Sequence, residues 1–183
     1  MVAGAVRLLA TQGPPGASFG DVLKETGAAR GSTYHHFPGG KEELYRAALD
    51  LASDRALRAL EPVRGQPADV VVERFFAMWR ALLTETDLRA GCAVLAVAVA
   101  GEPAQIRDDA GQIFRSWQSH LESLFVEGGL TPTKARSLAA LTMTSAEGAV
   151  AIARAERDLE TFELVAQQVL TITRQSMPVA KRI

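Results

Sequence analysis

The chain has 183 residues, of which 48% are hydrophobic, and a formal net charge of −1. A charge so close to zero argues against a general polyanion-binding protein, and no stretch approaches the roughly 18 apolar residues that a membrane helix needs. The single cysteine, Cys92, excludes an internal disulfide and fits a reducing compartment, so we expect a cytoplasmic protein.

The pattern predicts an all-α fold of about nine helices, because helix-forming residues are abundant and β-branched alternation is almost absent. A first helix covers about residues 2–11 and ends at the Gly-Pro-Pro-Gly turn of residues 13–16. Ser18 is then the predicted N-cap of a second helix over residues 19–26, with Asp21 as its capping-box partner.

Gly27 makes the next turn, and a short third helix follows over about residues 29–35. The fourth helix begins near residue 40 and continues to about residue 60, before the Arg-Gly-Gln-Pro turn of residues 64–67. We therefore divide the chain into a helix-turn-helix domain and a second, larger helical domain. Their predicted ranges are 1–46 and 47–183.

The second domain contains one segment, residues 91–101, that is apolar all round and is therefore expected to be buried on every side. Its periodicity alone also fits a strand, but its alanines and helical surroundings favour a helix. The remaining helices are predicted at about residues 68–86, 102–127, 131–157 and 159–176.

The third helix carries the side chains expected of a helix that lies in a DNA groove. Arg30 can pair with guanine, and Ser32 can reach a base or a phosphate. Residues 1–50 hold 5 basic and 5 acidic residues, so DNA contact must come from a local arrangement rather than from a basic field. The predicted DNA-contacting residues are Ser18, Arg30, Gly31, Ser32, Tyr34, His35, His36 and Lys41.

At these residues the chain resembles the TetR family of bacterial one-component repressors. The matching features are the capped second helix, Gly27, Gly31-Ser32, Tyr34-His-His-Phe37 and Lys41-Glu-Glu-Leu44. The Phe-Pro-Gly-Gly-Lys form and the sequence Gly91-Cys-Ala-Val-Leu are similar to an LmrA/YxaF-like subgroup. The chain departs from relatives in starting almost at the first helix, where they carry several further residues that are often basic.

The resemblance implies a dimeric repressor that leaves a near-palindromic double-stranded DNA operator when a small hydrophobic effector binds. The simplest interpretation of the large aromatic and methionine side chains of the second domain is that they form its hydrophobic core. Some of them are nevertheless expected to line the effector cavity. Cys92 is expected to be a small buried residue rather than a redox sensor. The predicted ligand-binding residues are Trp79, Cys92, Phe114, Trp117, Met143 and Glu147.

The last two helices each carry an apolar stripe at helical spacing, which either packs within the chain or forms a two-fold dimer. The small residues Ser145 and Gly148 permit close helix approach, and the resemblance favours the dimer. The predicted interface residues are Leu141, Ser145, Gly148, Ile152, Phe162, Val165, Val169 and Ile172.

A helical enzyme and a protein-interaction module are the competing interpretations. The sequence offers no phosphate loop, no metal-binding His-Glu pattern and no nucleophile constellation, so neither catalysis nor a metal or cofactor is expected. An activator role stays open, and the sequence does not identify the effector, the operator or the regulated genes.

Overall fold

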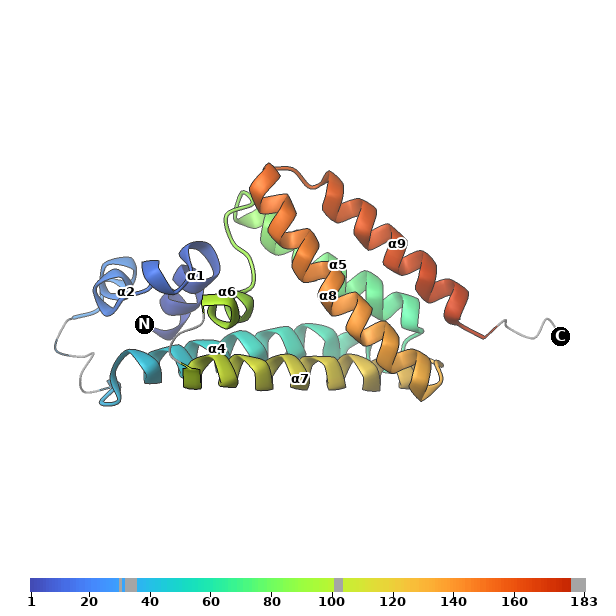
Figure 1. Ribbon diagram of the computed structural model, residues 1–183, viewed down its shortest axis with the longest axis horizontal. Coiled ribbons are helices and arrows are strands. Elements are labelled where there is room, and N and C mark those ends of the chain that lie inside the picture. The colour runs from blue at the N-terminus through green and yellow to red at the C-terminus, as the bar shows by residue number, and fades with distance from the viewer. Residues whose placement is uncertain (30, 32–35, 101–103, 179–183) are drawn as a thin grey trace. The chain divides into compact units, whose positions relative to one another are not determined.

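The computed structural model describes residues 1–29, 31, 36–100 and 104–178 (Figure 1). These residues form eight α-helices and two short 3-10 helices, with no strand among them, which confirms the all-α prediction. Predicted and observed helix ends agree within about two residues where both are described. The α-helices are α1 (Val2–Gln12), α2 (Phe19–Thr26), α4 (Gly40–Leu60), α5 (Ala68–Glu85), α6 (Ala93–Ala100), α7 (Ala104–Glu127), α8 (Pro132–Glu156) and α9 (Glu160–Ser176).

The chain divides into two compact units, each built from two separate stretches of sequence. Residues 1–56 and 90–115 make the first unit, and residues 57–89 and 116–183 make the second. Both boundaries at 56/57 and 115/116 fall inside helices, so α4 and α7 each contribute to both units. None of the described helices is long and apolar enough to cross a membrane.

The first unit is built around α1, whose buried face carries Ala5, Leu8 and Leu9. A Cβ at Gly4 would lie 2.3 Å from Thr26 Cγ2, so α1 and α2 approach closely at a residue without a side chain. A side chain at position 4 would therefore have to displace Thr26.

Helix α6 packs against α1 in the same unit, and the Gly91 N–H donates to Ala10 O at 2.8 Å just before it. The prediction that this segment is buried on every side is wrong, because Val99 is 74% exposed. Only one side of this eight-residue helix is covered, with Ala93, Val94 and Val97 on it. Apolar composition identified the helix correctly but overestimated its burial.

In the second unit α5, α8 and α9 lie side by side (Figure 1). The rings of Phe76 on α5 and Phe162 on α9 meet edge to face with centroids 5.7 Å apart. Arg80 on α5 binds both carboxylate oxygens of Glu163 on α9, at 2.5 and 2.6 Å. This hydrogen-bonded pairing lowers the pKa of Glu163 and raises that of Arg80.

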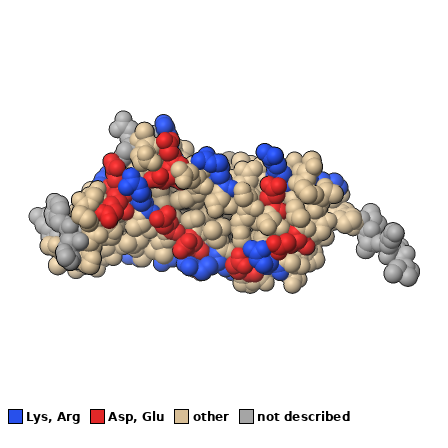
Figure 2. Space-filling view, turned by 90° about the horizontal axis from the view of Figure 1, so that it is seen from below, with Lys and Arg blue, Asp and Glu red and all other residues tan. Residues whose placement is uncertain are grey.

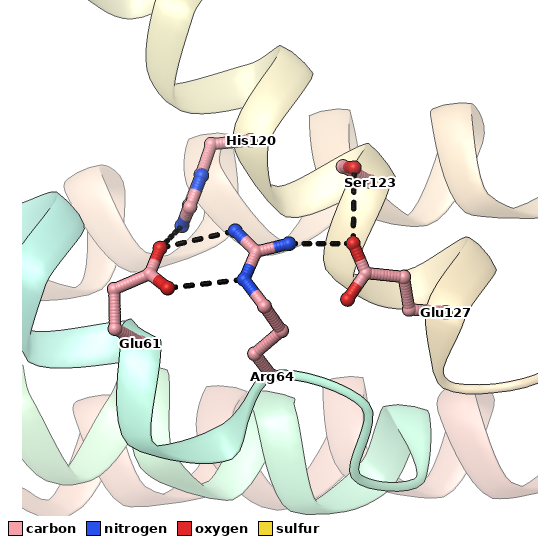
Figure 3. Close-up of polar contacts among 5 residues, drawn as sticks. All are labelled: Glu61, Arg64, His120, Ser123 and Glu127. Atoms are coloured by element: carbon pink, nitrogen blue, oxygen red, sulfur yellow. Dashed lines mark hydrogen bonds and ion pairs between the residues drawn. The ribbon is translucent and has the colours of Figure 1, made fainter.

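A polar cluster fixes the chain just after α4 to the end of α7 (Figure 3). Arg64 donates to both oxygens of Glu61 at 3.0 Å, and its Nη1 donates to Glu127 Oε1 at 2.5 Å. The Arg64 guanidinium holds the pKa of Glu61 below its usual range. Beside it, the Ala68 N–H donates to the Gly128 carbonyl at 3.3 Å, so side-chain and main-chain contacts coincide. We call Glu61, Arg64, Ala68, Glu127 and Gly128 the α4–α7 joint.

His120 lies on α7 against the α4–α7 joint, with its side chain 16% exposed and Nε2 3.5 Å from Glu61 Oε1 (Figure 3). Burial lowers the pKa of His120, opposed by Glu61 and Glu127 and reinforced by the Arg64 charge. The native protein therefore favours the neutral imidazole. A sequence reading that treats His120 as an isolated histidine misses this environment.

Because folding lowers the pKa of His120, stability should fall on acidification. The unfolded chain takes up this proton near the ordinary value of about 6.5, where the folded protein still resists it. The stability that comes from keeping His120 neutral is fully present above about pH 6.5. It is lost as the pH falls through the lower pKa of His120 in the folded protein. We expect His120→Gln to reduce the pH dependence of the free energy of unfolding as the pH falls below about 6.5. If the free energies of unfolding of the two proteins, measured by urea unfolding, change equally with pH in this range, the prediction is wrong.

Candidate DNA-binding site, ligand domain and interface

The helix-turn-helix begins with a complete capping box at Ser18. The Ser18 hydroxyl accepts from the Asp21 N–H at 3.2 Å, while the Ser18 N–H and hydroxyl both donate to Asp21 Oδ2. These bonds hold the pKa of Asp21 below its usual range. Ser18 is exposed, but its hydroxyl proton is engaged by a carboxylate, so a phosphate contact there would compete with Asp21.

Gly27 ends α2 in the left-handed conformation, with φ 66°, and its N–H donates to Leu23 O at 2.9 Å. This conformation is unfavourable for residues with a Cβ, so glycine allows the sharp turn after α2 at little cost. The capping box and the turn were both predicted from the sequence, and both are observed.

Tyr45 is the residue of this region that sequence reasoning missed. It is 2% exposed, and its hydroxyl donates towards the carbonyls of Pro14 at 2.8 Å and Ala17 at 3.3 Å. Burial raises the pKa of this hydroxyl, which keeps it a donor. Tyr45 therefore connects α4 to the turn between α1 and α2. Its position directly after buried Leu44 was the available signal.

Lys41 stands at the head of α4, exposed, with Nζ 5.0 Å from the centre of the Tyr45 ring. A cation over an aromatic face is held in place without losing its charge. The preceding Gly39 N–H donates to Glu43 Oε2 at 2.7 Å, which caps the helix. Lys41 is thus fixed at the end of a rigid helix, as a phosphate-binding residue would have to be.

Most of the predicted recognition helix lies outside the described residues. Arg30, Ser32, Tyr34 and His35 belong to that part. Gly31 and His36 are helical and exposed, and a Cβ at Gly31 would meet nothing within 4 Å. Their roles on DNA stay predictions.

The six residues predicted to bind a ligand divide between the two units. Cys92 and Phe114 belong to the first, and Trp79, Trp117, Met143 and Glu147 to the second. Phe114 and Trp117 are half-buried, and the other four are buried. Cys92 Sγ accepts from the Leu95 N–H at 3.3 Å, so this thiol helps to begin α6. Whether these residues contact an effector stays a prediction.

In the second unit, Trp79 Nε1 on α5 and Thr142 Oγ1 on α8 are buried without a hydrogen-bond partner among the described residues. Trp79 is 7% exposed and Thr142 is fully buried. A buried polar atom without a partner costs about 1–3 kcal/mol, so both positions are sites where a bound polar group would be favourable. Thr142 was not among the predicted residues.

An open groove of about 310 Å³ lies between α5 and α9. Its lining includes the apolar side chains of Phe76 and Leu170 and the charged side chains of Arg80 and Glu163. None of the predicted ligand-binding residues lines this groove.

The predicted dimer stripe is largely at the surface. On α8, Leu141 and Ile152 are 37% and 44% exposed and Gly148 is exposed, while Ser145 is half-buried. Val165 and Ile172 on α9 are also half-buried.

Two members of the α9 stripe are placed differently. Phe162 is fully buried and Val169 is 3% exposed, so both pack within this chain and are not available to a partner. The outward apolar residue is instead Leu164, at 66% exposure. The 3–4 spacing identified an apolar stripe, but α9 has a core face towards α5 and α8 and a separate outer face, which spacing does not distinguish.

Comparison with known proteins agrees with this architecture. Residues 1–48 match the family "Bacterial regulatory proteins, tetR family", and residues 67–168 match "Transcriptional regulator LmrA/YxaF-like, C-terminal domain". An uncharacterised HTH-type transcriptional regulator of Mycobacterium tuberculosis is 32% identical over 100% of this chain and 96% of its own. The HTH-type transcriptional regulator LmrA of Bacillus subtilis is 24% identical over 82% of each chain.

Solved structures show the same fold. A TetR transcriptional regulator from Legionella pneumophila superposes with a TM-score of 0.78 at 23% identity, covering 97% of this chain and 95% of that one. One from Chloroflexus aurantiacus gives 0.78 at 25% identity, covering 98% and 94%. With both family models matched along the chain, this protein belongs to the TetR family of transcriptional regulators, in its LmrA/YxaF-like group, and is a DNA-binding regulator rather than an enzyme.

Proposed function

We propose that this regulator is a homodimeric repressor that a small, largely hydrophobic effector releases from a near-palindromic operator. The observation that carries the proposal is the helix-turn-helix joined rigidly to α4: Tyr45 binds the α1–α2 turn, and Lys41 is held on its ring. A movement of α4 would therefore carry the DNA-binding part with it.

Lys41 and the residues around the third helix would dock the protein on DNA. Lys41 would bind a phosphate beside the N-terminus of α4, where the helix dipole also favours an anion. Arg30 would read a guanine in the major groove. The remaining predicted contacts are Ser18, Gly31, Ser32, Tyr34, His35 and His36.

The dimer would form through the outer faces of α8 and α9. Leu141, Ile152 and Leu164 are the exposed large apolar side chains of these helices, and burying them against a partner would remove apolar area from water. A Cβ at Gly148 would meet nothing within 4 Å in its own chain, so a partner helix could approach closely there. The revised interface comprises Leu141, Ser145, Gly148, Ile152, Leu164, Val165 and Ile172.

The effector would bind in the helical ligand domain and bring a hydrogen-bonding group into an apolar environment. Trp79 Nε1 can only donate, so it would select an acceptor such as a carbonyl or ether oxygen. Met143 and Trp117, which belong to the same compact unit as Trp79, would contact the apolar part of the molecule. Effector binding would release DNA only if it favoured the released state; a coupling of about 1–3 kcal/mol changes operator affinity roughly 5- to 150-fold.

For DNA binding, we expect Lys41→Ala to weaken binding similarly for all sequences and to reduce the salt slope by about one unit. Arg30→Ala should cost about 1–3 kcal/mol and relax preference at one base position. The measurement is fluorescence anisotropy on a duplex enriched from a random pool by the unmodified protein. Lys134→Ala on α8 is the control for loss of a lysine. Unchanged titrations for both test variants would exclude this docking.

For the dimer, we expect Gly148→Leu to raise the monomer fraction in sedimentation at micromolar concentration. The added side chain has open space in its own subunit, so any loss of association comes from the partner side. Gln167→Leu is a matched control, because it adds the same side chain at an exposed position of α9 in the α5–α9 groove. A monomeric unmodified protein would refute the interface.

For the ligand domain, Thr142→Val should leave the free protein as stable as before, or up to about 1 kcal/mol more stable, because it replaces an unpartnered hydroxyl with a methyl group. Thr173→Val is the control: this equally buried hydroxyl donates to Val169 O at 2.8 Å, and its loss should cost about 0.5–1.5 kcal/mol. Urea unfolding gives both values. Equal destabilisation would show that Thr142 is satisfied in the free protein.

The effector itself can be sought by tryptophan fluorescence during titration with a panel of hydrophobic drugs and metabolites, paired with operator binding. A compound that quenches fluorescence and lowers operator affinity supports the proposed response. If compounds bind but none changes operator affinity, the site does not control DNA binding.

A further inference from the structure

In each compact unit an arginine forms an ion pair with a carboxylate of α7. One arginine lies in α4 and the other in the turn that follows it, and we call this stretch, residues 40–64, the α4 segment and the two ion pairs the ties. In the first unit Arg46 Nε donates to Asp109 Oδ2 at 3.0 Å. In the second, Arg64 Nη1 donates to Glu127 Oε1 at 2.5 Å. The two residues of each pair are 63 positions apart, so both ties connect the same two stretches of chain in the same direction.

These ties differ from the other long-range ion pairs by the helices that they join. Arg7 pairs with Glu25 between α1 and α2. Arg80 pairs with Glu163, and Arg174 pairs with Asp69 and Glu73, between α5 and α9. Helices α4 and α7 are the two that run through both units. A tie between them therefore acts on the elements that can carry a signal from one unit to the other.

The second-unit tie is reinforced by a backbone contact with no room for a side chain. A Cβ at Gly128 would lie 2.7 Å from Gln66 O and 2.8 Å from Ala68 N. The turn after α4 consequently rests directly on the turn after α7. Separating the two helix ends would break the Arg64–Glu127 bond and the Ala68–Gly128 bond together.

The ties are partly solvated. Arg64 and Glu127 are 41% and 35% exposed, and Figure 2 shows basic and acidic side chains beside one another over this face of the protein. Exposed ion pairs contribute at most about 1 kcal/mol. Contacts of that size bias an equilibrium between two arrangements without preventing the change, which is what a regulatory contact requires.

We propose that the Arg64–Glu127 tie of the α4–α7 joint is a positioning contact that sets the balance between DNA-binding and DNA-released arrangements. The inference rests on the proposed function, because it assumes that α4 moves when the regulator leaves DNA. Arg64 acts through α4 and touches neither DNA nor effector in this proposal. The Arg46–Asp109 pair would hold the same two helices in the first unit.

The test is operator affinity in the absence of any effector, measured by anisotropy on a duplex that the unmodified protein enriches from a random pool. We expect Arg64→Gln and Glu127→Gln to change affinity by about two- to fivefold in the same direction, the range that an exposed ion pair allows. The double variant should change affinity no more than Arg64→Gln alone, because Arg64→Gln already removes the bond that Glu127→Gln breaks. Arg174→Gln breaks ion pairs of similar exposure between α9 and α5 and should bind as the unmodified protein does.

Gly128→Ala provides a second variant that disturbs the joint without changing charge, and it should shift affinity in the same direction as Arg64→Gln. Circular dichroism and thermal unfolding establish that each variant is folded. If Arg64→Gln and Glu127→Gln bind like the unmodified protein, or if Arg174→Gln shifts affinity equally, the positioning role is wrong. If the unmodified protein enriches no duplex at all, the proposed repressor function fails first, and this inference fails with it.

Discussion

The structure depends on one helix, α4, whose side chains are buried in both compact units. Helix α4 buries Leu44, Ala48 and Leu49 in the first unit and Leu60 in the second, so its position is set at both ends. A continuous helix transmits displacement along its axis because its backbone hydrogen bonds resist bending. In the proposed response, the contacts at the two ends of α4 would determine how strongly effector binding changes DNA binding.

Those contacts differ in kind. At the DNA end, the Tyr45 hydroxyl is buried and donates to main-chain carbonyls of the α1–α2 turn, and breaking such contacts leaves buried polar groups unsatisfied. At the other end, Arg64 reaches Glu61 and Glu127 through partly exposed pairs, where water can replace each partner at small cost. The helix is thus firmly joined to the part that it carries and more loosely joined to the part that would move it.

Local sequence signals predicted local features well. The capping box at Ser18, the left-handed Gly27 and the length of α4 depend on residues that are close in sequence, so propensity and spacing were sufficient. Features that depend on residues distant in the sequence were harder to predict. The exposure of Val99 depends on α6 being covered on one side only, and the burial of Phe162 depends on Phe76, 86 positions earlier. A period of 3.6 residues identifies an apolar face but not the element that covers it.

The charged residues illustrate the same limit. Arg64, His120 and Glu127 are ordinary surface residue types, and in the sequence Arg64 was no more than part of a turn. Their meaning comes from the parallel course of the α4 segment and α7, which brings residues 63 positions apart into contact twice. Because folding raises the cost of protonating His120 next to this cluster, the joint also becomes less stable in acid. Charge pairing at the ends of long helices therefore gives this fold a weak, adjustable contact where its buried core could offer only a rigid one.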